Sequence, residues 1–201
     1  MCELSELEKR YVEVSSDCEK YLSEYKSCIS SNLNGTIISK GPLYNLRPYE
    51  IERVGFKKGR QLNKLPSAIK NTHVYYFDKL DRIILIEIYG QSESIVNREF
   101  CVYGDNCLER VCFTSAGILR NISISFFEGS VVKKDVSWGM YGCSISHYIY
   151  NGSVLEKITV QQKEHDDPSF SEFDVIFKYK NNELETITNV FPNGYQEQRF
   201  P

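Results

Sequence analysis

A short pattern that recurs four times in the second half of the chain is the feature that most constrains its fold. An aromatic residue is followed, after four positions, by an aliphatic residue, and a second aliphatic residue follows three positions later. Turn-forming residues lie between them, and Asn151-Gly152 tolerates the positive φ that a two-residue hairpin turn requires. The copies are Tyr103/Leu108/Val111, Tyr150/Leu155/Ile158, Tyr179/Leu184/Ile187 and, one position out of step at its last member, Phe127/Val132/Val136.

The spacing of these copies predicts the architecture. They begin at positions 103, 127, 150 and 179, so they lie 24, 23 and 29 residues apart. Each interval has room for two strands and two turns, and a hairpin needs neighbours to cover its apolar face. Between the copies, Ile122, Ile124 and Phe126 alternate with serines, which predicts one buried and one solvent-facing side. We therefore expect a mainly β (α+β) fold built as a repetitive antiparallel meander of hairpins.

The start of the chain is predicted to be helical over residues 3–30. Its apolar residues recur at steps of three and four, and the sequence at 14–16 is expected to divide the helix in two. The stripe consists of Leu4, Leu7, Tyr11, Val14, Cys18, Tyr21, Tyr25 and Cys28. Tyrosine and cysteine favour packing on a sheet over a self-dimerising coiled coil. The expected organisation is a helical segment, 1–39, packed on a hairpin-repeat domain, 40–201, as one structural unit.

Three other segments complete the expected fold. Residues 40–72 are interrupted by Gly and Pro, so they predict short strands and loops, and residues 40–82 carry ten basic and four acidic side chains. The run Ile83–Tyr89 is apolar on both faces and predicts a strand covered from two sides. The turn at 190–195 contains Pro192 and predicts a last hairpin at the sheet edge.

Composition and thiols narrow the functional classes. No basic start precedes an apolar run, and seven cysteines without a Cys-x-x-Cys pair favour reduced thiols in the cytoplasm.

Cys143 and His147 would share a strand face roughly 13 Å apart, too far for proton transfer. The acidic run at 164–168 lacks the glycine and ligand spacing of a calcium loop, so an exposed acidic connection is favoured. We expect no enzyme, cofactor, metal, nucleic-acid partner or membrane partner.

One stretch resembles a known family. Tyr75-Tyr76-Phe77-Asp78-Lys79-Leu80-Asp81-Arg82-Ile83-Ile84 resembles the tyrosine-aspartate repeat of bacterial Rhs proteins, with Asp81 where glycine is usual. The later copies resemble the looser tyrosine-Asn-Gly repeats of small intracellular antitoxins. Over about residues 54–201, the chain is therefore similar to bacterial immunity proteins encoded beside polymorphic or contact-dependent toxins.

That resemblance implies a non-enzymatic inhibitor that binds and neutralises a cognate protein toxin domain. It transfers no site residue, so contact residues are chosen from the solvent face and turns that the pattern predicts. The predicted toxin-binding residues are Tyr148, Tyr150, Asp166, Asp167 and Trp138. The alternation of side chains along the predicted strand also allows Trp138 to lie in the core. The chain is expected to be a monomer or a weak homodimer. The alternative is an Rhs-type carbohydrate- or surface-binding β module, which would predict export.

Overall fold

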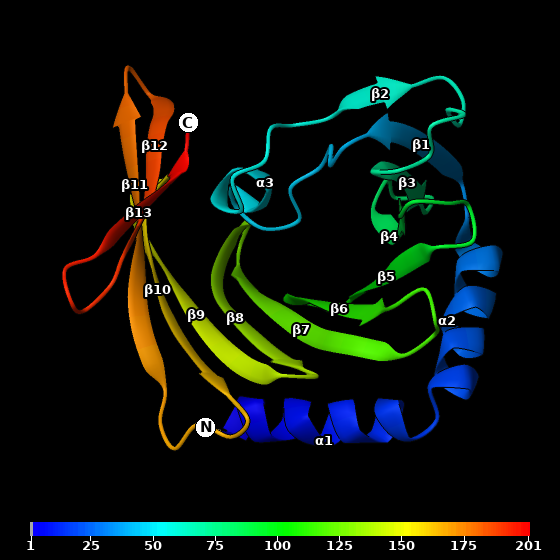
Figure 1. Ribbon diagram of the computed structural model, residues 1–201, viewed down its shortest axis with the longest axis horizontal. Coiled ribbons are helices and arrows are strands. Elements are labelled where there is room, and N and C mark those ends of the chain that lie inside the picture. Colours follow the sequence, from blue (N-terminus) through cyan, green and yellow to red (C-terminus); the bar gives the residue numbers. More distant parts are fainter. Residues whose placement is uncertain (1) are drawn as a thin grey trace.

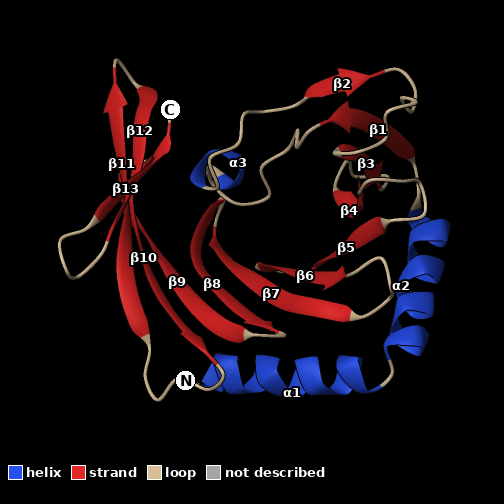
Figure 2. Ribbon diagram, viewed as in Figure 1, coloured by secondary structure: helices blue, strands red, loops and turns tan. Residues whose placement is uncertain are grey.

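The computed structural model describes residues 2–201 and is dominated by one antiparallel sheet (Figures 1 and 2). The helices are α1 (Cys2–Ser16), α2 (Cys18–Asn32) and α3 (Glu50–Arg53). The strands are β1 (Gly35–Lys40), β2 (Arg60–Leu62), β3 (Thr72–Phe77), β4 (Ile83–Tyr89), β5 (Val96–Tyr103), β6 (Cys107–Phe113), β7 (Leu119–Glu128), β8 (Val131–Gly139), β9 (Gly142–Asn151), β10 (Val154–Glu164), β11 (Ser171–Lys180), β12 (Glu183–Val190) and β13 (Gln196–Phe200). The predicted β-meander with an N-terminal helix is confirmed.

The sheet runs almost entirely in sequence order. From β13 to β3 each strand pairs with its neighbour in the chain, and only β1 departs from this order by lying between β3 and β2. Figure 1 shows the sheet curled into an open trough, with α1 and α2 on its outer side and α3 on its inner side. The last hairpin is at the sheet edge, as its proline predicted, because β13 pairs only with β12.

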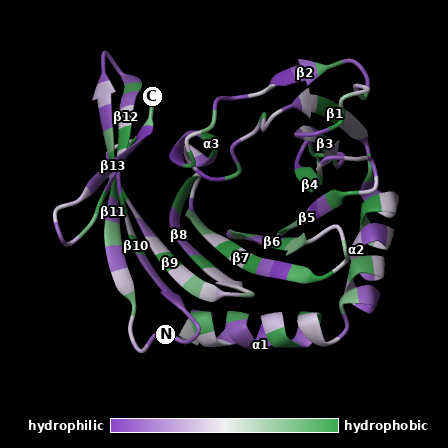
Figure 3. Cartoon of the chain, viewed as in Figure 1, coloured by the Kyte–Doolittle hydropathy of each residue, from purple (hydrophilic) through white to green (hydrophobic). Residues whose placement is uncertain are grey.

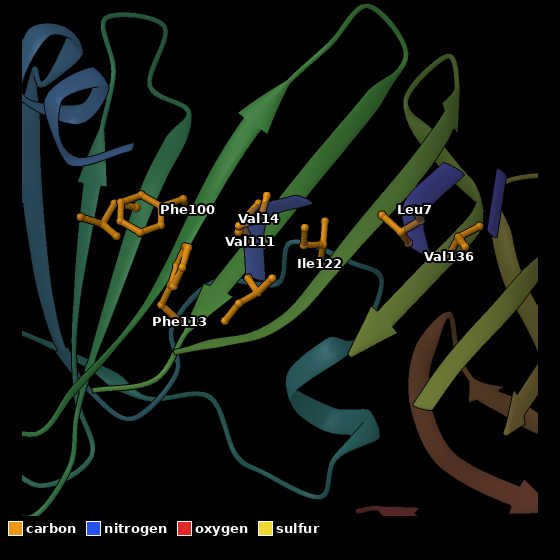
Figure 4. Close-up of a cluster of buried hydrophobic side chains, with 9 residues drawn as sticks. Leu7, Val14, Phe100, Val111, Phe113, Ile122 and Val136 are labelled. Atoms are coloured by element: carbon orange, nitrogen blue, oxygen red, sulfur yellow. The ribbon is translucent and has the colours of Figure 1, made fainter. Parts of the chain in front are cut away.

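The N-terminal helices cover the outer face of the sheet. The helix divides where the sequence predicted, since α1 ends at Ser16 and the Asp17 side chain caps α2 by accepting a hydrogen bond from the backbone N–H of Lys20 at 3.2 Å. Leu7 and Val14 are fully buried against β6, β7 and β8 (Figure 4). Burying a side chain of this size contributes about 1.5–3 kcal/mol. The stripe shifts in α2, where Cys28 is exposed and Ile29 packs instead.

One predicted boundary needs correction. The helical segment proposed for 1–39 ends at Asn32, and residues 35–40 form β1 inside the sheet. The reason is tertiary, because β1 pairs along its whole length with β3. The expectation that Ile83–Tyr89 is covered from two sides holds, since Leu85 faces the helices while Ile83 and Ile86 face the loop that follows β1.

The recurring pattern sets the register of the hairpins. In all four copies the aromatic residue pairs across the hairpin with the aliphatic residue five positions later, as Tyr150 does with Leu155. In the turn between β3 and β4, Asp81 takes the left-handed conformation at φ 56°, which glycine usually supplies. The Asp78 carboxylate accepts hydrogen bonds from the backbone N–H groups of Leu80 and Arg82 at 2.9 Å each.

Residues 41–59, here called the strap, include α3 and cross the inner face of the sheet (Figure 1). The two ends of the strap meet, because the N–H of Gly59 donates to the carbonyl of Pro42 at 2.6 Å. The strap changes the environment of β7. Ser123 and Ser125 were predicted to face solvent, but they are buried beneath it. On β11, by contrast, the polar residues Asp174 and Lys178 do lie on the outer face, and the apolar residues Val175 and Phe177 face inward.

Hydropathy follows this arrangement. Figure 3 shows apolar and polar residues mixed along each strand, and an apolar stripe on α1 that faces the sheet. None of the helices in the described part of the chain has the length and apolar character needed to cross a membrane.

Candidate functional site

The five residues predicted from the sequence fall at two separate places. Alternate turns of a meander lie at opposite ends of its sheet, so the β7–β8, β9–β10 and β11–β12 turns share one end and the β8–β9 and β10–β11 turns share the other. Tyr148 and Tyr150 face the inner side of the trough. Trp138 lies on the outer side of β8, beside the loop that carries Asp166 and Asp167. These residues therefore do not form a single contact patch.

The prediction that Tyr148 is an outward-facing contact residue is wrong. Its side chain is only 4% exposed and packs with Leu155, Ile158 and Val175. Its hydroxyl donates a hydrogen bond to the Asp135 carboxylate and accepts one from Arg53 of the strap at 3.1 Å. The sequence pattern cannot reveal which side of a strand faces the trough, because both sides of β9 carry aromatic or aliphatic residues.

A buried ionic network joins the strap to the inner face, and sequence reasoning missed it. Arg110 of β6 forms ion pairs with Glu99 of β5 and with Glu50 of the strap, the second at 2.5 Å. Arg47 of the strap binds Asp135 of β8 at 3.2 Å. Arg47 also donates a hydrogen bond at 2.6 Å to the hydroxyl of the buried Ser123. The only sequence signal was a set of polar residues at alternate positions of otherwise apolar strands.

The network sets the protonation of its own members. Burial alone would raise the pKa of Glu50, but the guanidinium groups of Arg110 and Arg47 outweigh it and hold the pKa below its ordinary value. Burial would lower the pKa of Arg110, and Glu99 and Glu50 outweigh it and raise the pKa further. Glu50 and Arg110 are therefore both charged at neutral pH. Each member has an ionic partner within the fold, so the network holds the strap in place.

Tyr150 lines a groove on the inner side of the trough. The groove has a volume of about 840 Å³ and lies between strap residues 45–49 and the tips of the β7–β8, β9–β10 and β11–β12 hairpins. The ring of Tyr150 is half-buried, and its hydroxyl has no hydrogen-bond partner within residues 2–201. The prediction that Tyr150 faces outward is therefore wrong in direction, although the residue still borders an opening.

The loops at the other end form a preorganised pair. The ring of His165 packs on Trp138 with centroids 4.9 Å apart, and its Nε2 lies 2.8 Å from the carbonyl oxygen of Gly139. The backbone N–H of His165 donates to the carbonyl of Tyr141 at 3.1 Å. Asp167 accepts a hydrogen bond from the N–H of Glu164 at 3.2 Å. Trp138 thus supports the acidic loop from below and is partly buried itself.

Aromatic and acidic side chains gather on these two loops. The surface they form, here called the acidic-loop surface, comprises Met140, Tyr141, Glu164, His165, Asp166, Asp167 and Phe170. All seven are exposed, and Tyr141 is 79% exposed. A polar cleft of about 440 Å³ opens beside Tyr141, Glu164 and Asp167, and its lining includes Ser137, Ser144 and Lys163. The Lys163 ammonium lies 5.6 Å from the ring centroid of Phe170. Exposed aromatics on fixed loops are typical anchors of protein interfaces.

Six cysteines of the described residues have free thiols, and burial keeps at least two of these thiols protonated. Cys143 and His147 share the outer face of β9 as predicted, but Cys143 is buried and His147 is exposed. Burial raises the pKa of Cys101 and Cys143, so both thiols stay protonated at neutral pH. Cys18, Cys28, Cys101, Cys107, Cys112 and Cys143 are free, and the side chain of Cys2 lies outside the described residues. Residues 2–201 contain no group of three or more His, Cys, Asp or Glu placed to hold a metal ion.

Comparison with models of known protein families and with curated proteins gives no match to this chain.

Proposed function

We propose that the protein is a cytoplasmic immunity protein of a bacterial toxin system, which binds a cognate toxin domain and neutralises it without chemistry of its own. The observation that carries the proposal is the acidic-loop surface, where Tyr141 stands 79% exposed beside Asp166 and Asp167. A fixed aromatic anchor with adjacent carboxylates suits a basic protein surface, since charge complementarity speeds encounter and selects the partner.

The geometry around the anchor supports this reading. The cleft beside Tyr141 is lined by serine hydroxyls and bordered by Glu164 and Asp167, with one lysine opposing them. An arginine or lysine of the partner finds hydrogen-bond acceptors and net negative charge there. Hydrogen bonds from His165 to the other loop, and one within the acidic loop, fix the positions of both loops before binding. Little conformational entropy is then lost when the partner docks.

Co-expression with the protein encoded by the adjacent gene tests the proposal. The two should co-purify as a stable one-to-one complex, and cells expressing the adjacent gene product should grow only when this chain is present. The double variant Asp166→Lys/Asp167→Lys should lose both complex and protection. The matched control Glu183→Lys/Glu185→Lys makes the same charge change at two exposed positions on β12. These positions lie next to the β11–β12 turn, at the other end of the sheet, so the control should retain both the complex and the protection. Loss of protection in both variants, or in neither, would count against the acidic-loop surface.

A further inference from the structure

We propose that the inner groove is a second binding site, which receives a proline-rich segment of a partner protein in the polyproline II conformation. The inference does not depend on the acidic-loop surface, because the groove lies at the opposite end of the sheet. Its walls are the strap segment 45–49 and the tips of three successive hairpins. Three features of the groove select this ligand: aromatic residues on alternate strands, the pairing of its one charged lining residue among those described, and one unpartnered hydroxyl.

Three aromatic residues form a ladder across alternate strands of the groove. Phe127, Tyr150 and Tyr179 are the first residues of three copies of the hairpin pattern, and all three line the groove. They stand on β7, β9 and β11, which are alternate strands of the sheet. Because neighbouring strands are about 4.8 Å apart, alternate strands are separated by roughly 9.6 Å.

This step matches the repeat of a polyproline II helix. That helix has three residues per turn and rises about 3.1 Å per residue, so equivalent side chains recur every 9.3 Å or so. A proline-rich segment that crosses the strands can place one ring-packing face against each aromatic residue in turn. Aromatic-lined grooves are the usual receptors for such segments, which lose little entropy on binding because their shape is preformed.

The strap completes the groove with a fourth aromatic ring. Tyr49 packs on Phe177 with centroids 5.5 Å apart and on Tyr179 at 6.3 Å. Its backbone has φ 53° and ψ 33°, a left-handed conformation that is uncommon for a residue with a large side chain. The surrounding fold holds this residue against the strain, which places its ring over the end of the ladder.

Charge and hydrogen bonding select the same kind of ligand. The single charged residue among the described groove-lining residues is Arg47, which is already paired with Asp135 and Glu50. The ammonium of Lys133 lies 5.3 Å from the ring centroid of Tyr150 and is paired with Glu128 at 3.4 Å. Because both cations are paired, the groove suits an uncharged ligand. The hydroxyl of Tyr150 is buried without a partner. A proline-rich chain offers backbone carbonyls as acceptors and has few N–H groups that need partners of their own, so one carbonyl can accept from Tyr150.

Fluorescence anisotropy of fluorescein-labelled decaproline, titrated with the full-length protein, tests the proposal. Decaproline should bind saturably, and a Gly-Ser decamer with the same label should not. Tyr150→Phe should weaken decaproline binding roughly two- to ten-fold, as expected for one hydrogen bond. The same variant should keep or raise the midpoint of thermal unfolding, because it removes a buried hydroxyl that has no partner in the free protein. Tyr141→Phe, at the opposite end of the sheet, should leave binding unchanged.

Mapping the site on the wild-type protein provides a second readout that needs no variant. Decaproline should shift the backbone amide NMR signals of residues 127–132, 150–155 and 179–182, and leave those of 164–170 in place. The proposal is overturned by an absence of saturable decaproline binding, by equal binding of the Gly-Ser decamer, by an unchanged affinity in Tyr150→Phe, or by shifts that lie outside the groove. Binding of cellohexaose in the groove without binding of decaproline would overturn it in favour of a carbohydrate.

Discussion

The hydroxyl of Tyr148 on β9 donates a hydrogen bond to the carboxylate of Asp135 on β8, on the inner face of the sheet. Both groups are also held by the strap, since Arg53 donates to the Tyr148 hydroxyl at 3.1 Å and Arg47 pairs with Asp135 at 3.2 Å. This pair therefore joins the strap to the hairpin repeat. A residue that the repeat pattern placed on the surface is an interior anchor.

Tyr148→Phe should destabilise the fold by about 1–3 kcal/mol, because it removes the buried hydrogen bonds of the hydroxyl to Asp135 and Arg53 while it conserves the ring. Urea unfolding followed by circular dichroism measures the change. Tyr195→Phe is the control, since Tyr195 is exposed in the β12–β13 turn, and it should change stability by less than about 0.5 kcal/mol. Equal effects in the two variants would contradict the anchoring role.

Arg110→Ala should destabilise the protein by about 3–5 kcal/mol, because it leaves the buried Glu99 without its cation and leaves Glu50 with only the longer ion pair to Arg47, at 3.9 Å. Thermal or urea unfolding at pH 7 gives the value. Lys178→Ala removes a cation from an exposed position on the outer side of β11 and should be close to neutral. A loss below 1 kcal/mol in Arg110→Ala would mean that the network contributes little to the position of the strap.

The pH dependence of stability should show the charge on Glu50. Its folded-state pKa is held below the unfolded value, so the unfolded chain binds the proton more tightly. The stabilisation is fully present above the unfolded pKa of about 4.3 and is lost as pH falls through the folded pKa. The gap in unfolding free energy between the wild type and Glu50→Gln should therefore narrow from pH 6 to pH 3. A gap for Glu50→Gln that does not change with pH would refute the assignment.

Gly59 is required where the two ends of the strap meet. A Cβ at this position would lie 2.5 Å from the carbonyl oxygens of Lys40 and Gly41, which are backbone atoms and cannot rotate away. Gly59→Ala should therefore cost about 1–3 kcal/mol in unfolding free energy. Gly35→Ala is the matched control, because a Cβ there meets no atom within 4 Å. The two variants should differ clearly in urea midpoint, and equal midpoints would show that the strap end tolerates movement.

The predictability of this fold follows the range of its contacts. Hairpins such as Tyr150–Leu155 pair residues five positions apart, so turn chemistry and alternation were sufficient to set their register. The strap could not be predicted, because its hydrogen bond from Arg47 to Ser123 spans 76 positions and no local pattern links them. The orientation of the Tyr148 side chain could not be predicted for the same reason, because it depends on how the sheet curls. Asp166 and Asp167 were recognised as an exposed acidic loop, since the run at 164–168 has no apolar side that a core could use.

The affinity of the adjacent-gene product for variants of the acidic-loop surface tests the proposed function most directly. Isothermal titration calorimetry should show one-to-one binding of the wild type. The affinity should fall at least ten-fold in Tyr141→Ala and in Asp166→Lys/Asp167→Lys, as expected when each change removes more than about 1.4 kcal/mol of binding free energy. Glu183→Lys/Glu185→Lys should bind like the wild type. Unchanged affinity in both surface variants, or no complex with the wild type, would contradict the proposal.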